Sequence, residues 1–110
     1  MIKVGEHITL DIIGTKKEYE ASFFEGLVHK IAKKAKVTVL NIAKYKFEPQ
    51  GFTLVALLAE SHISFHTYPE KGIISFDFYT CGTVAPSIAL EVIKKEIEHK
   101  RIIKKELNRD

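Results

Sequence analysis

A carboxylate, two hydroxyls and two imidazoles lie within seven positions of the chain, directly after an apolar stretch. The apolar stretch covers residues 52–59 and is broken only by Thr53. The polar groups that follow it are Glu60, Ser61, His62, Ser64 and His66. A buried polar group without a hydrogen-bond partner costs about 1–3 kcal/mol, so an ordinary core strand has no use for such a cluster.

The only cysteine of the chain lies one predicted hairpin away from this cluster. Residues 73–79 alternate between apolar and polar side chains and run directly into Thr80-Cys81-Gly82. Taken singly, Ser61 is typical of a strand end and Cys81 of a small buried side chain. Together, a hydroxyl, an imidazole, a carboxylate and a thiol are the groups used in nucleophilic and acid–base catalysis. Their arrangement therefore favours an enzyme.

The two histidines of the cluster do not predict a metal site. His62 and His66 are four residues apart, which on a helix would place them on one face as a metal-binding pair. The surrounding pattern predicts a strand instead, on which a rise of about 3.3 Å per residue separates them by roughly 13 Å. That distance is too long for one shared ion, so no metal is predicted.

Composition predicts one globular domain over residues 1–110, because this length suffices for one core. No apolar run approaches the roughly 20 residues that span a bilayer, and no signal peptide is recognisable, so no membrane partner is expected. A single cysteine fits a reducing cytoplasm.

The net charge is only +3, and the basic residues near the C-terminus alternate with glutamates. This mixture is typical of a solvated face, and nucleic-acid binding is the least favoured function.

The elements predicted along the chain describe an α+β fold. Alternation predicts strands, and apolar residues at helical spacing predict two amphipathic helices, the second with Pro86 in its first turn and Thr83 as its cap. Residues 52–59 are apolar on both faces, as in a central strand. This strand either ends before His62 or continues into the strand at 62–67. The expected strands are 7–13, 37–47, 52–59, 62–67, 73–79 and 102–107, and the expected helices are 19–35 and one beginning at Pro86. This order predicts a two-layer sandwich, with a mainly antiparallel sheet and helices on one face.

The arrangement resembles the prokaryotic S-adenosylmethionine decarboxylase proenzyme, a pyruvoyl-dependent family. The likeness runs from the strand at Gly5-Glu6-His7 to the second helix. It departs from the family pattern at Phe52, Thr53 and Tyr68, where the family commonly has a small aliphatic residue, serine and tryptophan. The segments that carry the likeness are 47–51, Glu60-Ser61-His62, 66–70, Asp77 and Thr80-Cys81-Gly82.

The resemblance implies that the chain cuts itself between Glu60 and Ser61. The products would be residues 1–60, the beta chain, and 61–110, the alpha chain. Ser61 would become a covalent pyruvoyl group, the cofactor, whose carbonyl binds the substrate amine and accepts electrons during decarboxylation. His66 would assist this processing, and the Thr53 hydroxyl would stabilise its tetrahedral intermediate.

The resemblance also assigns the residues that act on the substrate. Cys81 would return a proton to the substrate carbon, since a thiol with a pKa near about 8.5 can act as an acid at neutral pH. Phe47 would contact the adenosyl end of S-adenosylmethionine, and Glu70 would bind its ribose hydroxyls. The product would be the aminopropyl donor for spermidine and other polyamines.

Two alternatives share the predicted fold. A pyruvoyl-dependent enzyme could act on another amino acid such as arginine, because the pyruvoyl chemistry does not depend on the side chain. A relative that never cleaves could serve as a regulatory subunit, although intact Ser61, His66 and Cys81 argue against it.

A sheet with helices on one face leaves its other face partly exposed, so a homodimer of processed protomers is expected.

Overall fold

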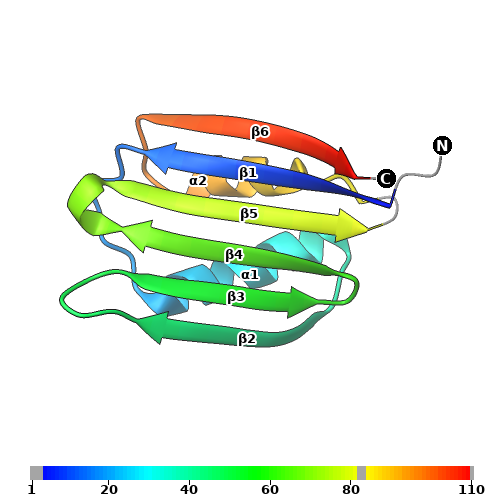
Figure 1. The fold of residues 1–110 in the computed structure, drawn as a ribbon, viewed down its shortest axis with the longest axis horizontal. Helices are drawn as coiled ribbons and strands as arrows, with labels where there is room; N and C mark the ends of the chain where they lie inside the picture. The colour runs from blue at the N-terminus through cyan, green and yellow to red at the C-terminus, as the bar shows by residue number, and fades with distance from the viewer. Residues whose placement is uncertain (1–3, 82–83, 110) are drawn as a thin grey trace.

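The computed structural model describes residues 4–81 and 84–109 as a six-stranded sheet with two helices on one face (Figure 1). The strand order is β2-β3-β4-β5-β1-β6, and every neighbouring pair is antiparallel. This architecture confirms the predicted α+β sandwich. The elements are β1 (Gly5–Ile13), α1 (Ala21–Ala35), β2 (Val39–Lys46), β3 (Phe52–Leu58), β4 (Ser61–Tyr68), the 3-10 turn η1 (Pro69–Lys71), β5 (Ile73–Cys81), α2 (Ile88–Glu96) and β6 (Arg101–Arg109).

The core lies between the sheet and the helices. Alternate residues of the central strands point toward the helices, as the two-residue period of a strand requires, and pack on an apolar stripe of α1. Lys36 ends α1 in the left-handed conformation and donates its backbone N–H to carbonyls of the last turn. The largest core side chains, all fully buried, are Phe24, Phe65, Phe78, Ile8, Leu10, Ile12, Leu27, Ile31, Leu54, Leu58, Ile63 and Ile93.

Two local predictions differ from the structure, and one alternative that the sequence left open is decided. β3 is not buried on both faces, because Val55 and Leu57 project from the side of the sheet that carries no helix, where Leu57 is 53% exposed. The open alternative concerned the end of β3, which stops at Leu58, so β4 is a separate strand. Pro86 lies in a tight turn before α2 rather than inside the helix, whose N-cap is Ser87. Thr83 lies outside the described residues.

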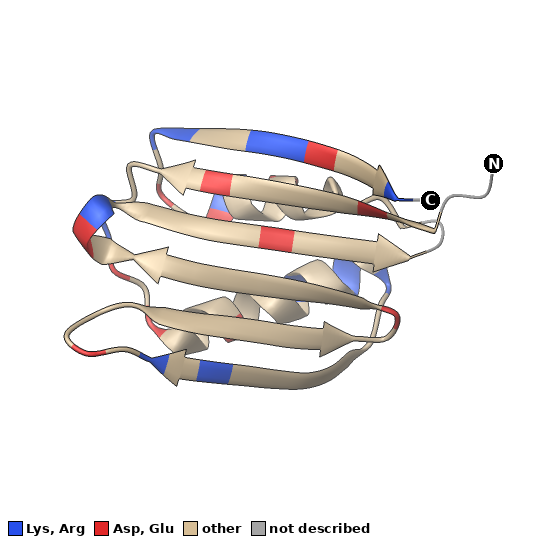
Figure 2. Ribbon diagram, viewed as in Figure 1, with Lys and Arg blue, Asp and Glu red and all other residues tan. Residues whose placement is uncertain are grey.

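The face of the sheet opposite the helices, here called the open face, has a centre that is poor in charge (Figure 2). β3 and β4 contain no Lys, Arg, Asp or Glu, and β5 contains only Asp77. Basic residues gather instead on β2 and β6. On β6, Lys104 Nζ lies 3.3 Å from Glu106 Oε1. A weakly charged face is suited to burial against another surface. Exposed apolar side chains on this face are Tyr45, Val55, Leu57, Ile103 and Leu107.

Neither helix is suited to crossing a bilayer. Among the residues that the structure describes, no helix is both long enough and apolar enough to do so. The cytoplasmic location and the expected lack of nucleic-acid and membrane partners stay predictions.

Candidate active site

The turn between β3 and β4 holds the predicted cleavage point. Leu58 pairs with Ser61 across the hairpin, so only Ala59 and Glu60 form the turn. Glu60 has a φ of 61°, in the left-handed region that favours glycine. A side chain held there costs on the order of 1–3 kcal/mol, and such strain is concentrated at functional sites. The Glu60–Ser61 bond therefore follows directly on a strained residue.

The Ser61 hydroxyl is buried without a hydrogen bond to any described residue. Ser61 is only 8% exposed, and its Oγ has no partner within the part of the chain that the structure describes. An unsatisfied buried hydroxyl costs about 1–3 kcal/mol, so a native protein keeps one only for a reason. An Oγ free of competing hydrogen bonds is available to attack a neighbouring carbonyl.

Ser61 and Cys81 both line one cavity of the protein. The cavity has a volume of about 360 Å³ and opens at the end of the sheet where β5 stops. Cys81 is a half-buried free thiol. A pocket that both residues line, with room for a small molecule, is a candidate reaction site. Its lining residues are Lys36, Val37, Thr38, Ala59, Glu60, Ser61, Thr80, Cys81 and Val84.

Tyr79 is a neighbour of Cys81 that sequence reasoning missed. The pKa of Tyr79 is raised, first by a side-chain hydrogen bond with Cys81, then by burial and by the electrostatic effect of Cys81, while the charge of Arg109 lowers it. The Arg109 guanidinium lies 5.5 Å from the centre of the tyrosine ring. The rings of His7 and His62 pack around Tyr79 at centroid distances of 5.9 and 5.8 Å. Tyr79 therefore stays protonated and helps to orient the thiol.

Gly5 makes room for Tyr79, which predicts an effect of enlarging it. A Cβ atom at Gly5 would overlap the Tyr79 hydroxyl and the Thr80 carbonyl oxygen. We expect Gly5→Ala to cost about 1–3 kcal/mol through overpacking, which lowers the Tm of a domain this size by at least about 4 °C. Thermal unfolding measures the change.

Gly26→Ala is the matched control, because a Cβ atom at Gly26, within α1, meets no atom within 4 Å. Alanine is favoured over glycine inside a helix, so the Tm of this control should stay the same or rise. Equal Tm values for the two variants would contradict the close packing around Gly5.

A second group of predicted residues lies toward the other end of β4. Thr53 and His66 are opposite one another on β3 and β4, and Thr53 Oγ1 lies 2.9 Å from His66 Nδ1 in a hydrogen bond. Both line a cavity of about 280 Å³ together with Phe47 and Glu70. The structure thus gathers four predicted residues in one place, with Phe47 exposed at the rim.

The two groups do not meet within one chain. Ser61 is the first residue of β4, and His66 is five residues further along the same strand. At about 3.3 Å per residue their Cα atoms are roughly 16 Å apart, beyond the reach of a side chain. His66 of the same protomer therefore cannot contact the Glu60–Ser61 bond in this conformation.

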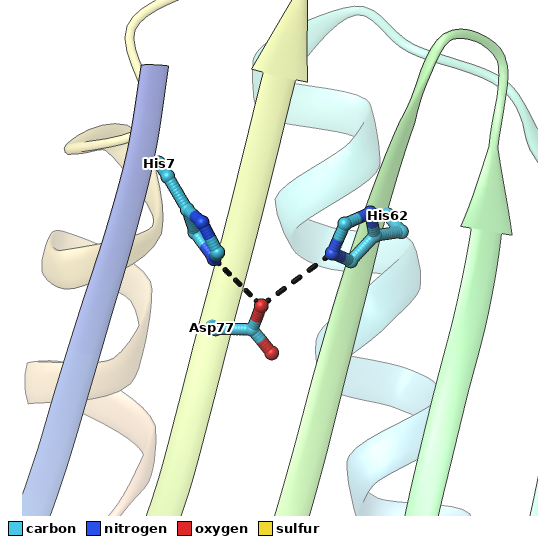
Figure 3. A group of neighbouring side chains, drawn as sticks. All are labelled: His7, His62 and Asp77. Carbon is cyan, nitrogen blue, oxygen red and sulfur yellow. Dashed lines mark hydrogen bonds and ion pairs between the residues drawn. The ribbon is translucent and has the colours of Figure 1, made fainter. Parts of the chain in front are cut away.

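A third group is centred on Asp77 of β5, as Figure 3 shows. His7 Nε2 lies 2.7 Å from Asp77 Oδ1, and His62 Nε2 lies 3.5 Å from the same oxygen. The Ser64 hydroxyl donates a hydrogen bond to the other carboxylate oxygen, Oδ2. All four side chains lie on the open face. The sequence predicted no role for His7.

Comparison with known proteins identifies the family. The model of the S-adenosylmethionine decarboxylase family matches residues 6–110. An S-adenosylmethionine decarboxylase proenzyme of Prochlorococcus marinus strain MIT 9313 is 38% identical over 110 residues, which cover 97% of this chain and 88% of that protein. A proenzyme of the same name from Brevibacillus brevis is 37% identical over 108 residues, or 96% of this chain and 81% of that one.

The fold agrees with this relationship. The crystal structure of the adenosylmethionine decarboxylase from Aquifex aeolicus superposes with a TM-score of 0.86 at 35% identity, covering 97% of this chain and 91% of that one. The fold and the Ser61–Cys81 cavity thus occur in a chain whose nearly whole length matches one family of decarboxylases. The chain belongs to the S-adenosylmethionine decarboxylase family, as the resemblance indicated.

Proposed function

We propose that this chain is a proenzyme that cuts itself between Glu60 and Ser61 and then decarboxylates S-adenosylmethionine. The observation that carries the proposal is the buried Ser61 hydroxyl, which has no hydrogen-bond partner among the described residues and lies beside the strained Glu60, in a cavity that Cys81 also lines. The names of the relatives, all decarboxylase proenzymes, support both the substrate and the processing. The product would serve polyamine synthesis.

The processing step uses groups of the chain itself. Ser61 Oγ attacks the carbonyl carbon of Glu60 and loses its proton, and the C–N bond to Ser61 breaks, so that an ester replaces the amide. A base then removes the α-proton of Ser61, and the Glu60 carboxylate leaves. Addition of water and loss of ammonia give the pyruvoyl group at the new N-terminus of residues 61–110. Strain at Glu60 favours the first step, because cleavage relieves it.

The surroundings of Ser61 fit a pyruvoyl group. The Ser61 Oγ would leave with the Glu60 carboxylate, and the keto oxygen on the former Ser61 Cα would come from the added water, in a cavity of about 360 Å³ that leaves space for a substrate. When formed, the group supplies an electron sink that amino-acid side chains lack. Cys81 holds the proton that the substrate carbon needs, and Tyr79 fixes the thiol by its hydrogen bond.

The second cavity supplies contacts for the rest of the substrate. Phe47 offers an aromatic face to the adenosyl end and the sulfonium cation of S-adenosylmethionine. The Glu70 carboxylate can accept hydrogen bonds from the ribose hydroxyls.

Release of carbon dioxide from S-adenosylmethionine, compared with arginine in the same assay, tests the substrate. Release from arginine alone would refute the assignment.

A homodimer resolves the separation between Ser61 and His66. Each chain carries Ser61 and Cys81 in one cavity, and Thr53 and His66 in another. Pairing of the open faces about a two-fold axis would place the first cavity of one copy near the second cavity of its partner. The exposed apolar residues and low charge of this face support such pairing.

A mixture of two inactive variants tests the shared site. We expect Ser61→Ala and His66→Ala each to stay whole when expressed alone. When they are co-expressed with different tags, a mixed dimer combines the Ser61 of one chain with the His66 of the other. The His66→Ala chain should then be cleaved, as a denaturing gel would show. If that chain stays whole in a verified mixed dimer, the two residues do not cooperate across the interface.

A further inference from the structure

Three side chains on neighbouring strands converge on one point of the open face (Figure 3). His7 of β1 and His62 of β4 both lie opposite Tyr79 of β5, one on each side of it. Asp77 precedes Tyr79 by two residues and therefore lies on the same face of the sheet. The register of three hydrogen-bonded strands thus holds two imidazoles on either side of one carboxylate.

The donor atoms are close enough to share one ion. The two Nε2 atoms lie 2.7 and 3.5 Å from Asp77 Oδ1, and one donor atom from each residue lies within 4.8 Å of the others. Ligands bound at about 2.0–2.1 Å to a zinc ion are about 2.9–3.4 Å apart in octahedral or tetrahedral geometry. The two spacings to Asp77 Oδ1 bracket this range, and the donor atoms of the two imidazoles lie within 4.8 Å of each other. The His62 side chain is 44% exposed in the single chain, and the open-face pairing proposed above would place this site at the dimer interface.

Ser64 gives the carboxylate the support that metal ligands usually have. The Ser64 hydroxyl donates a hydrogen bond to Asp77 Oδ2. Ser64 is buried. Oδ1 is the oxygen that faces both imidazoles. Ligating carboxylates are commonly oriented by a second hydrogen bond in this way, and loss of the supporting group typically lowers metal affinity by about 10–100-fold.

We propose that His7, His62 and Asp77 bind one divalent first-row transition ion, with zinc as the natural probe. Two imidazole nitrogens and one carboxylate oxygen suit zinc, whereas magnesium and calcium prefer oxygen ligands alone. Three protein ligands leave a coordination position for water or another small ligand. His62 and His66 are still too far apart to bind one ion together. In the proposed site the partners of His62 are His7 and Asp77 instead. The ion would connect β1, β4 and β5.

Zinc titration of the whole purified protein tests the site. We expect one zinc ion per chain and, at zinc concentrations well above Kd, a Tm rise of at least about 5 °C. Magnesium should cause no rise. His62→Gln should lower zinc affinity at least about tenfold, and Ser64→Ala by a similar factor through the loss of support for Asp77.

Two controls separate this site from other zinc-binding groups. His29→Gln removes an exposed histidine of α1 and should leave affinity unchanged, and Cys81→Ala should also retain the ion. If His62→Gln fails to fold, the Co²⁺ absorption spectrum of the unaltered protein replaces it, because a thiolate ligand gives strong charge-transfer bands that imidazole and carboxylate do not. Sub-stoichiometric binding, equal losses in His29→Gln and His62→Gln, or loss of the ion in Cys81→Ala would overturn the proposal.

Discussion

Ser61→Ala should stay at full length and show no decarboxylase activity. Without the Oγ atom no ester can form at Glu60, and without the ester there is no route to the pyruvoyl group. The loss should be complete, because Ser61 supplies the atoms from which the cofactor is made. A denaturing gel and an assay of carbon dioxide release, performed on the same sample, measure both effects.

Ser22→Ala is the matched control, because it makes the same chemical change at an exposed position of α1. It should be processed and active like the unaltered chain. Activity in Ser61→Ala, or a cut chain in that variant, would show that the reactive group arises elsewhere.

Cys81→Ala should still be cleaved but should turn over substrate about 10²–10⁴-fold more slowly, the usual cost of losing a general acid. Backbone cleavage needs the Ser61 hydroxyl and a base, whereas the thiol is needed only to return a proton to the substrate carbon. Some enzyme should become inactivated when the proton is delivered to the wrong atom. Fragment yield and turnover are to be measured in one preparation.

Val84→Ala controls for lost volume, because Val84 lines the same cavity and has no titratable group. Its effect on turnover should be far smaller than that of Cys81→Ala. If Cys81 only fills space, both variants will lose a little stability and retain near-normal turnover. Complete cleavage together with unaltered turnover in Cys81→Ala would remove the thiol from the mechanism.

The sheet and its core were predictable because apolar side chains alternate along most strands. β3 lacks this alternation, and its apolar side chains on both faces led to an error, because Val55 and Leu57 lie exposed on the open face. Hydrophobicity alone cannot distinguish a residue buried by its own chain from one that a second chain could cover. The break between β3 and β4 was also ambiguous, since neither Ala59 nor Glu60 is a typical turn residue.

The candidate site was predictable only in part. Ser61 and Cys81 both line one cavity, at the ends of the neighbouring strands β4 and β5, which the sequence predicted as a hairpin. The separation of Ser61 and His66 follows from the strand rise that also separates His62 from His66. Tyr79 could not be recognised, because its contacts depend on the register that brings β1, β4 and β5 together. Asp77 gains its two imidazole neighbours in the same way.

The intact mass of the protein under denaturing conditions tests self-cleavage most directly. The account predicts two fragments, residues 1–60 and the remaining 110 − 60 = 50 residues. The second fragment should resist N-terminal sequencing and be lighter, by one molecule of ammonia, than the same segment beginning with serine. A chain that remains whole after long incubation while it releases carbon dioxide from S-adenosylmethionine would contradict the account.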